Sequence, residues 1–275
     1  MEIAGYFLMA LVGVSLGLIG GGGSILTVPI LVYVMGVNPV LATSYSLFIV
    51  GATSMAGAYN NYRKGLVNVK TALLFGVSSI TTVFLTRKII MPVVPAVLFS
   101  NRHVHITHSV ATMILFAILM LMASIAMIKN KDEHNSSVAT GANKPIQLTR
   151  LSLYGIAIGL ATGLLGAGGG FLLIPALVLL VKMPMKQAIG TSLLIIALNS
   201  LIGFTGDIGN FIIDWKFLIA LTVIAIAGIF AGGFLAKKFN GEKLKKGFGW
   251  FVLAMGIYII AKELFFYLSI ALTLK

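Results

Sequence analysis

The sequence predicts an all-α polytopic membrane protein made of two homologous halves. Of its 275 residues, 59% are hydrophobic and 10% are charged, whereas about a quarter of the residues in a soluble domain are charged. Apolar runs of roughly 20 residues recur along the chain, a length that selects transmembrane helices over the alternating ten-residue strands of a barrel. A glycine-rich pattern occurs twice, which indicates an internal repeat.

The repeat rests on two stretches, "GLIGGGGSILTVPI" at residues 17–30 and "GLLGAGGGFLLIPA" at residues 163–176. When residues 13–70 are aligned with residues 159–216 without a gap, 17 of 58 positions are identical. The identical positions include glycines, a proline and serines in one register, which chance matching of apolar runs does not produce. We therefore predict that the two halves share one fold.

Each half is expected to contain the same four parts. The first part is a segment in which a helix is interrupted by glycines. Each glycine weakens a helix by roughly 1 kcal/mol relative to alanine, so a run of glycines is expected to break it. Three apolar helices follow, and a polar, turn-rich stretch separates the halves. The expected parts are a first repeat at 1–128 (broken segment 3–36, helices 39–59, 68–86 and 109–128), a linker at 129–150, and a second repeat at 151–275 (broken segment 151–182, helices 185–205, 214–236 and 247–268).

The Lys and Arg residues favour one topology. The formal net charge of +13 comes mostly from short connections between apolar runs, which marks membrane orientation rather than a nucleic-acid partner. If each broken segment enters the membrane and turns back, these residues divide fourteen against six between the two sides, and if each crosses fully they divide ten against ten. The richer side, which includes the linker, is then cytoplasmic. The other side holds Arg87, Lys88, Arg102, Lys216, Lys262 and Lys275.

An in-and-back segment followed by three crossings gives each half an odd number of crossings. The two halves are therefore expected to be inverted relative to one another, which is the plan of many secondary transporters. In such proteins the transport cycle alternates access around a site between the repeats.

The two glycine runs predict an anion-binding site. New apolar helices begin directly after them, so N-terminal N–H groups and positive dipole ends should lie near the middle of the bilayer. Two opposed N-termini could hold one small oxyanion, and the alternative is that the glycines serve close helix packing alone. The predicted binding residues in the glycine runs are Gly20, Gly21, Gly22, Gly23 and Ser24 in the first half, and Gly166, Gly168, Gly169 and Gly170 in the second.

Polar residues in the following helices extend this prediction. Ser46 and Ser192 occupy equivalent positions of the repeat and are candidate hydroxyl donors to the anion, although helical serines often bond back to their own backbone. Asn199 cannot remain unpaired in lipid, so it should face the interior. Asp207 is a candidate for proton or ion coupling. The alternative for Asp207 is a loop aspartate in the turn "GFTGDIGN".

Several other chemistries are disfavoured. The chain has no cysteine, which excludes disulfides, thiolate metal sites and thiol nucleophiles. Neither glycine run matches a phosphate-binding or dinucleotide-binding pattern. The three histidines of "HVHITH" at residues 103–108 have no carboxylate or thiol beside them, which favours an exposed loop over a metal site. We expect no enzyme activity, metal, cofactor or nucleic-acid partner. The expected partners are a small anion and the lipid bilayer, with a homo-oligomer left open.

The stretches "GLIGGGGSILTVPIL" and "GLLGAGGGFLLIPAL", each followed by A-x-x-x-S-L at residues 42–47 and 188–193, resemble the TauE/SafE sulfite exporter family. The stretch "GNFIIDW" at residues 209–215 is similar to the one that opens the family's next helix. The resemblance covers nearly the whole chain, although residues 81–108 lack the small-residue run of the second half. It implies a secondary transporter of small anions in the plasma membrane, the inner membrane of bacteria or archaea. Sulfite, organosulfonates or other sulfur-containing anions are the implied substrates, and a passive anion channel is the alternative.

Overall fold

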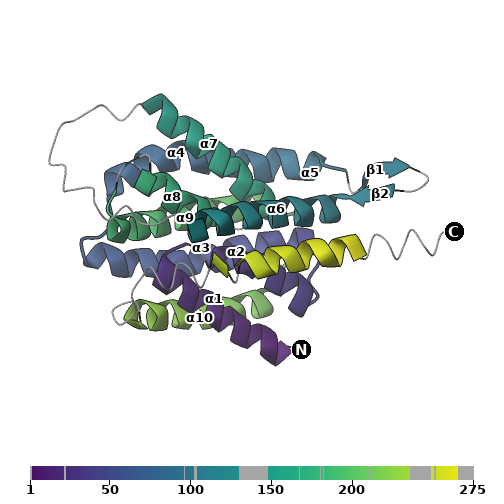
Figure 1. Ribbon diagram of the computed structural model, residues 1–275, viewed down its shortest axis with the longest axis horizontal. Helices are drawn as coiled ribbons and strands as arrows, with labels where there is room; N and C mark the ends of the chain where they lie inside the picture. The colour runs from purple at the N-terminus through teal and green to yellow at the C-terminus, as the bar shows by residue number, and fades with distance from the viewer. Residues whose placement is uncertain are drawn as a thin grey trace.

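Helices account for almost all of the secondary structure in the computed structural model (Figure 1). The structure describes residues 2–21, 23–95, 97–101, 104–129, 148–166, 168–179, 181, 183–210, 212–235, 249–250 and 252–265. The elements are α1 (Glu2–Ile19), α2 (Ser24–Pro29), the π-helical turn η1 (Ile30–Val34), α3 (Pro39–Arg63), α4 (Val69–Leu85), the π-helical turn η2 (Thr86–Ile90), α5 (Met91–Val93), β1 (Val97–Asn101), β2 (Val104–Thr107), α6 (His108–Lys129), α7 (Leu148–Leu165), α8 (Gly170–Leu179), α9 (Met185–Asp207) and α10 (Trp215–Leu235). Residues 249–250 and 252–265 are also helical.

Four of the described helices are long and apolar enough to cross a membrane. They span Pro39–Arg63, Val69–Val93, Lys186–Asp207 and Trp215–Leu235, and they coincide with four of the six expected crossings. The second of them runs past its expected end at residue 86, because the chain continues through η2 and α5 without leaving helical geometry. Shorter apolar helices include Val110–Met122 within α6.

The start of each helix in the α3–α4 pair is fixed by an asparagine cap. The side chain of Asn38 accepts the N–H of Val40 at 3.0 Å, and Pro39 occupies the first turn of α3. The side chain of Asn68 accepts the N–H of Thr71 at 3.0 Å and begins α4. Such caps satisfy N–H groups that have no partner within the helix.

The centre of the bundle is the pair α3 and α9, flanked by α10 on one side and α4 on the other (Figure 1). These two helices run antiparallel, because Leu47 lies against Gly203 at one end and Gly57 lies against Leu193 at the other. Outside them, α1 packs on α10 and α7 packs on α4.

Two hydrogen bonds tie the central pair to the starts of its neighbours. The Tyr45 hydroxyl on α3 accepts the backbone N–H of Asp214 at 2.8 Å, directly before α10. The Thr191 hydroxyl on α9 accepts the backbone N–H of Asn68 at 3.0 Å, directly before α4. Each central helix therefore positions the flanking helix of the other half.

Small residues allow the outer helices to approach closely. A Cβ added to Gly13 on α1 would collide with the backbone of Ala225 on α10. A Cβ added to Gly159 on α7 would lie 2.7 Å from the carbonyl oxygen of Ser79 on α4. The Gly-x-x-x-Gly spacings at residues 13–17 and 159–163 thus serve tight helix packing, as in other membrane helix pairs.

The first glycine run turns the chain back on itself. A Cβ added to Gly23 would lie 2.8 Å from the backbone nitrogen of Leu16, and one added to Gly5 would lie 2.8 Å from the side chain of Met35. The beginning of α1 therefore meets the end of η1, and α1, α2 and η1 form a helical hairpin. The 18 residues of α1 extend about 27 Å.

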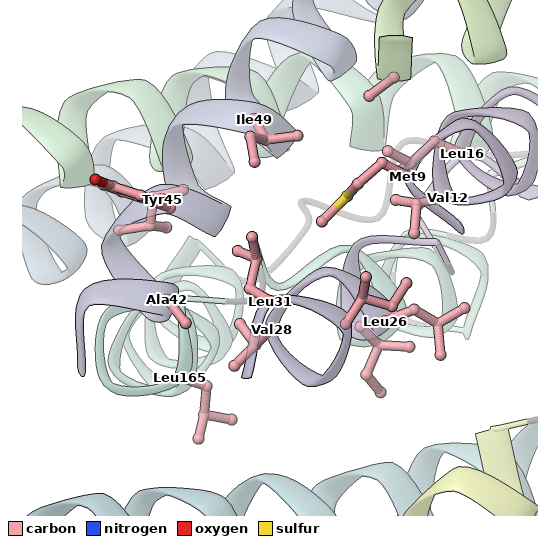
Figure 2. Close-up of a cluster of buried hydrophobic side chains, with 14 of the residues drawn as sticks. Met9, Val12, Leu16, Leu26, Val28, Leu31, Ala42, Tyr45, Ile49 and Leu165 are labelled. Carbon is pink, nitrogen blue, oxygen red and sulfur yellow. The ribbon is translucent and has the colours of Figure 1, made fainter. Parts of the chain in front are cut away.

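The hairpin is anchored in an apolar core. Figure 2 shows side chains of α1, α2 and η1 converging with side chains of α3. The labelled residues are Met9, Val12, Leu16, Leu26, Val28, Leu31, Ala42, Tyr45, Ile49 and Leu165. Between membrane-spanning helices such packing stabilises through van der Waals contact rather than through removal of apolar surface from water.

A small β-hairpin departs from the predicted all-α fold. Strands β1 and β2 pair antiparallel, with Phe99 opposite Ile106 and Asn101 opposite Val104. The segment at residues 97–107 is rich in β-branched and aromatic residues, which favour strands. The strands lie in the stretch where the first half departs from the second.

Candidate functional site

The first glycine of each run ends a helix. Gly20 and Gly166 have φ values of 84° and 67°, the left-handed region that glycine adopts without a Cβ penalty. Their N–H groups donate to the carbonyls of Leu16 at 2.8 Å and Thr162 at 2.9 Å. These two amides complete the last turns of α1 and α7 and use their N–H groups there.

The two glycine runs meet in the interior of the protein. A Cβ added to Gly21 would lie 2.7 Å from the carbonyl oxygen of Gly170, and one added to Gly170 would lie 2.6 Å from that of Gly21. Both glycines are buried. The structure therefore brings together two segments about 150 positions apart, and backbone touches backbone where they cross.

Several N–H groups at this crossing have no backbone partner. Within the described part of the chain, the N–H groups of Gly21, Gly23, Gly168 and Gly169 donate to no backbone carbonyl. The Ser24 hydroxyl is already used, since it donates to the carbonyl of Gly21 at 2.8 Å. Gly22 lies outside the described residues. Buried N–H groups without a partner are rare in proteins and suit an acceptor such as an anion.

The two equivalent serines differ in their partners. Ser46 on α3 and Ser192 on α9 are both buried. The Ser192 hydroxyl donates to the carbonyl of Ile189 at 2.9 Å, so it bonds back to its own helix. The Ser46 hydroxyl has no hydrogen-bond partner and keeps its donor available.

Asn199 faces the interior, as predicted. Its side-chain N–H₂ donates to the hydroxyl of Ser79 on α4 at 2.6 Å, while its Oδ1 is buried and unpaired. The hydroxyl of Ser200, a polar residue of the same helix that was not among the predicted binding residues, has its Oγ 2.9 Å from where a Cβ of Gly168 would be, and it too has no partner. The side chain of Ser200 thus points at the second glycine turn.

A buried ion pair lies beside this region. Arg87 in η2 and Asp207, the last residue of α9, are 0% and 1% exposed, and Nη1 of Arg87 is 3.0 Å from Oδ2 of Asp207. Nη1 also donates to the hydroxyl of Thr43 at 3.0 Å. Asp207 is therefore not a loop aspartate, and Arg87 is not one of the charges of a connecting segment. Hydropathy alone cannot find such a pair, because its two members are 120 residues apart in sequence.

The sequence was also compared with those of known proteins. Residues 6–259 match the family described as "Sulfite exporter TauE/SafE". The chain belongs to the TauE/SafE family. A "Probable membrane transporter protein" of Xylella fastidiosa (strain 9a5c) is 34% identical over 257 residues, 91% of each chain. The Bacillus subtilis "Probable membrane transporter protein YdhB" is 25% identical over 224 residues, 82% of this chain and 86% of the relative. No solved structure matches.

Membership of the TauE/SafE family makes this chain a probable multi-pass membrane transporter, from a family of transporters and not of enzymes. The four long apolar helices agree with that class. In the described residues of this TauE/SafE protein, no group of three or more His, Asp or Glu side chains is placed to hold a metal ion. His103 of the "HVHITH" stretch lies outside those residues.

Proposed function

We propose that this protein is a secondary transporter of small anions that works by alternating access, with sulfite, organosulfonates or other sulfur-containing anions as substrates. The observation that carries the proposal is the buried crossing of the two glycine turns, at Gly21 and Gly170, with unpaired N–H groups beside it. Backbone N–H groups at helix N-termini bind anions through hydrogen bonds and the helix dipole.

Under this proposal, the anion binds next to the crossing rather than between Gly21 and Gly170, because their backbones already touch. The N–H groups of Gly23, Gly168 and Gly169 and the unpaired hydroxyls of Ser46 and Ser200 are the donors that would surround it.

We further propose that the two halves form an inverted repeat. Several contacts between the halves come in equivalent pairs. Adding 146 to the residue number of one partner and subtracting 146 from that of the other converts the first contact of a pair into the second. Tyr45 with Asp214 and Thr191 with Asn68 form one such pair of contacts. Other exchanged contacts are Gly57 with Leu193 and Gly203 with Leu47, and Gly20 with Ile189 and Gly166 with Thr43.

This exchange is what a two-fold axis between the halves produces. Since α3 and its counterpart α9 are antiparallel, the axis lies across the helices, which supports inverted rather than parallel repeats. The hairpin of α1, α2 and η1 supports an in-and-back entry into the membrane, because Gly5 and Met35 lie together at its open end. The polar linker at residues 129–150 then lies on the cytoplasmic side of the plasma membrane.

The test is flux of radiolabelled anions into proteoliposomes that contain the purified protein. The panel is sulfite, thiosulfate, sulfoacetate, sulfate and phosphate, each with and without a pH gradient. Saturable flux of a sulfur-containing anion supports the proposal, whereas absence of flux for the whole panel refutes it. Flux that does not saturate indicates a passive channel instead.

A further inference from the structure

One nitrogen of the Arg87 guanidinium forms hydrogen bonds, and the other two nitrogens, on one edge of the group, form none. Nη1 donates to the Asp207 carboxylate and to the Thr43 hydroxyl, both at 3.0 Å. Nε and Nη2 are buried and have no hydrogen-bond partner. These two nitrogens form the edge whose parallel N–H groups match two oxygens of a carboxylate, a sulfonate or a phosphate. The free edge therefore has the charge and shape of an oxyanion site.

The position of Arg87 connects this edge to the second glycine turn. A Cβ added to Gly166 would overlap the backbone of Thr43, the residue whose hydroxyl holds Nη1. A Cβ added to Gly206 would lie 3.0 Å from the Cβ of Arg87. The arginine thus enters the interior where α7 ends, α3 begins and α9 ends.

A structural role alone leaves the free edge unexplained. Taking an ion pair out of water is costly, and two further unpaired donors add to that cost. A pair of apolar residues of similar volume would fill the same space without this desolvation cost. Among the described residues, Arg87 and Asp207 are the charged side chains that are buried. The unfavourable free energy of burying charge is therefore confined to this one place in the described structure. Buried donors without a partner commonly mark a ligand.

We propose that Nε and Nη2 of Arg87 bind two oxygens of the transported anion, while Asp207 and Thr43 hold the guanidinium in orientation. This rests on the proposed function and narrows its substrates to anions with at least two acceptor oxygens on one central atom. A halide can occupy only part of this edge. The second half offers no counterpart, since the positions 146 residues away are Gly233 and Asn61. The charged contact therefore lies at one end of the pathway.

The test measures binding of sodium sulfite and sodium methanesulfonate to the detergent-purified full chain by calorimetry. Arg87→Met combined with Asp207→Leu removes both charges, which avoids leaving one buried charge unpaired. Arg87→Lys keeps the charge and removes the paired N–H groups. Lys88→Met is the matched control, because it removes an exposed positive charge one residue further on. Thermal unfolding of each variant reports whether it is folded.

The expected result is wild-type affinity in the control, affinity about 10–100-fold weaker in Arg87→Lys, and no detectable binding in the folded double variant. Wild-type affinity in the folded double variant overturns the inference and leaves the proposed function to the flux assay. If the double variant does not fold, unchanged affinity in Arg87→Lys overturns it. Failure of the wild type to bind either anion also overturns it, whereas binding without flux removes the proposed function alone.

Discussion

At the scale of single residues, the glycines have two different structural roles. Gly20 and Gly166 end helices in a left-handed conformation, whereas Gly21 and Gly170 lie where two backbones touch. Either kind tolerates no side chain, so loss of activity on substitution does not by itself identify a ligand contact. A Gly168→Leu variant, for example, would meet Val50, Ser200 and Ile196 within about 3 Å before any anion is considered.

Gly166→Ala separates backbone strain from packing. Its φ of 67° is close to the 69° of Gly65, so alanine at either position costs about 1–2 kcal/mol of left-handed strain. At Gly166 the new Cβ would also overlap the Thr43 backbone, while at Gly65 nothing lies within 4 Å. We expect a clearly larger fall in thermal stability for Gly166→Ala than for Gly65→Ala. Equal melting temperatures would contradict the packing described here.

The ion pair of Arg87 and Asp207 is the other feature at this scale. Hydropathy placed both residues outside the membrane-spanning helices, whereas the structure buries them. Arg87 looks like a connecting-segment charge in the sequence, and Asp207 looks like part of a glycine-asparagine turn. Both are buried because α4 continues helically past residue 86 and brings Arg87 beside the end of α9. A pairing across 120 residues has no local signal.

At the scale of elements, the sequence predicted most helices and both glycine breaks. Periodic apolar length, glycine runs and polar linkers are local signals, so α3, α9 and α10 lie close to their expected ranges. The strands β1 and β2 were not predicted, because comparison of the halves marks residues 81–108 only as a departure from the repeat, whereas the signal for the strands is the β-branched and aromatic composition of residues 97–107. The crossing of the glycine turns follows from tertiary packing, and the sequence suggested it only through the repeat.

Close packing of α1 on α10 gives an element-scale prediction. Gly17→Leu should abolish stable folding, because even its Cβ would meet the backbone of Gly233 at 2.7 Å and overpacking is destabilising. Gly76→Ala on α4 is the matched control, since its Cβ would make an ordinary 3.5 Å contact with Ile80. Alanine there should stabilise the helix by about 0.5–1 kcal/mol. Size-exclusion profiles and melting curves of both variants measure this, and a well-folded Gly17→Leu protein would refute the α1–α10 contact.

At the scale of the whole molecule, helices pack on both sides of the antiparallel pair α3 and α9. Through Tyr45 and Thr191, each central helix holds the residue that directly precedes the other half's flanking helix. The inverted repeat proposed above would give two related conformations, open to opposite sides, from one sequence pattern. The buried ion pair of Arg87 and Asp207 has no counterpart under that proposal, since the positions 146 residues away are Gly233 and Asn61.

The orientation of the halves is testable because the chain has no cysteine. In an otherwise cysteine-free protein, Ser137→Cys and Lys64→Cys should react with a membrane-impermeant maleimide only after the cytoplasmic side is exposed. Asn210→Cys, in the exposed turn after α9, should react from the outside of intact cells. Labelling of Ser137→Cys in intact cells would reverse the proposed topology.

We propose that the two glycine turns, which meet inside the protein, bind a small anion in alternation from either side of the membrane. Counterflow of radiolabelled sulfite in proteoliposomes tests this proposal. We expect saturable uptake that accelerates when the vesicles are loaded with unlabelled sulfite, because the return of an occupied site is then possible in each cycle. Uptake that rises linearly with sulfite and ignores the internal load would contradict it.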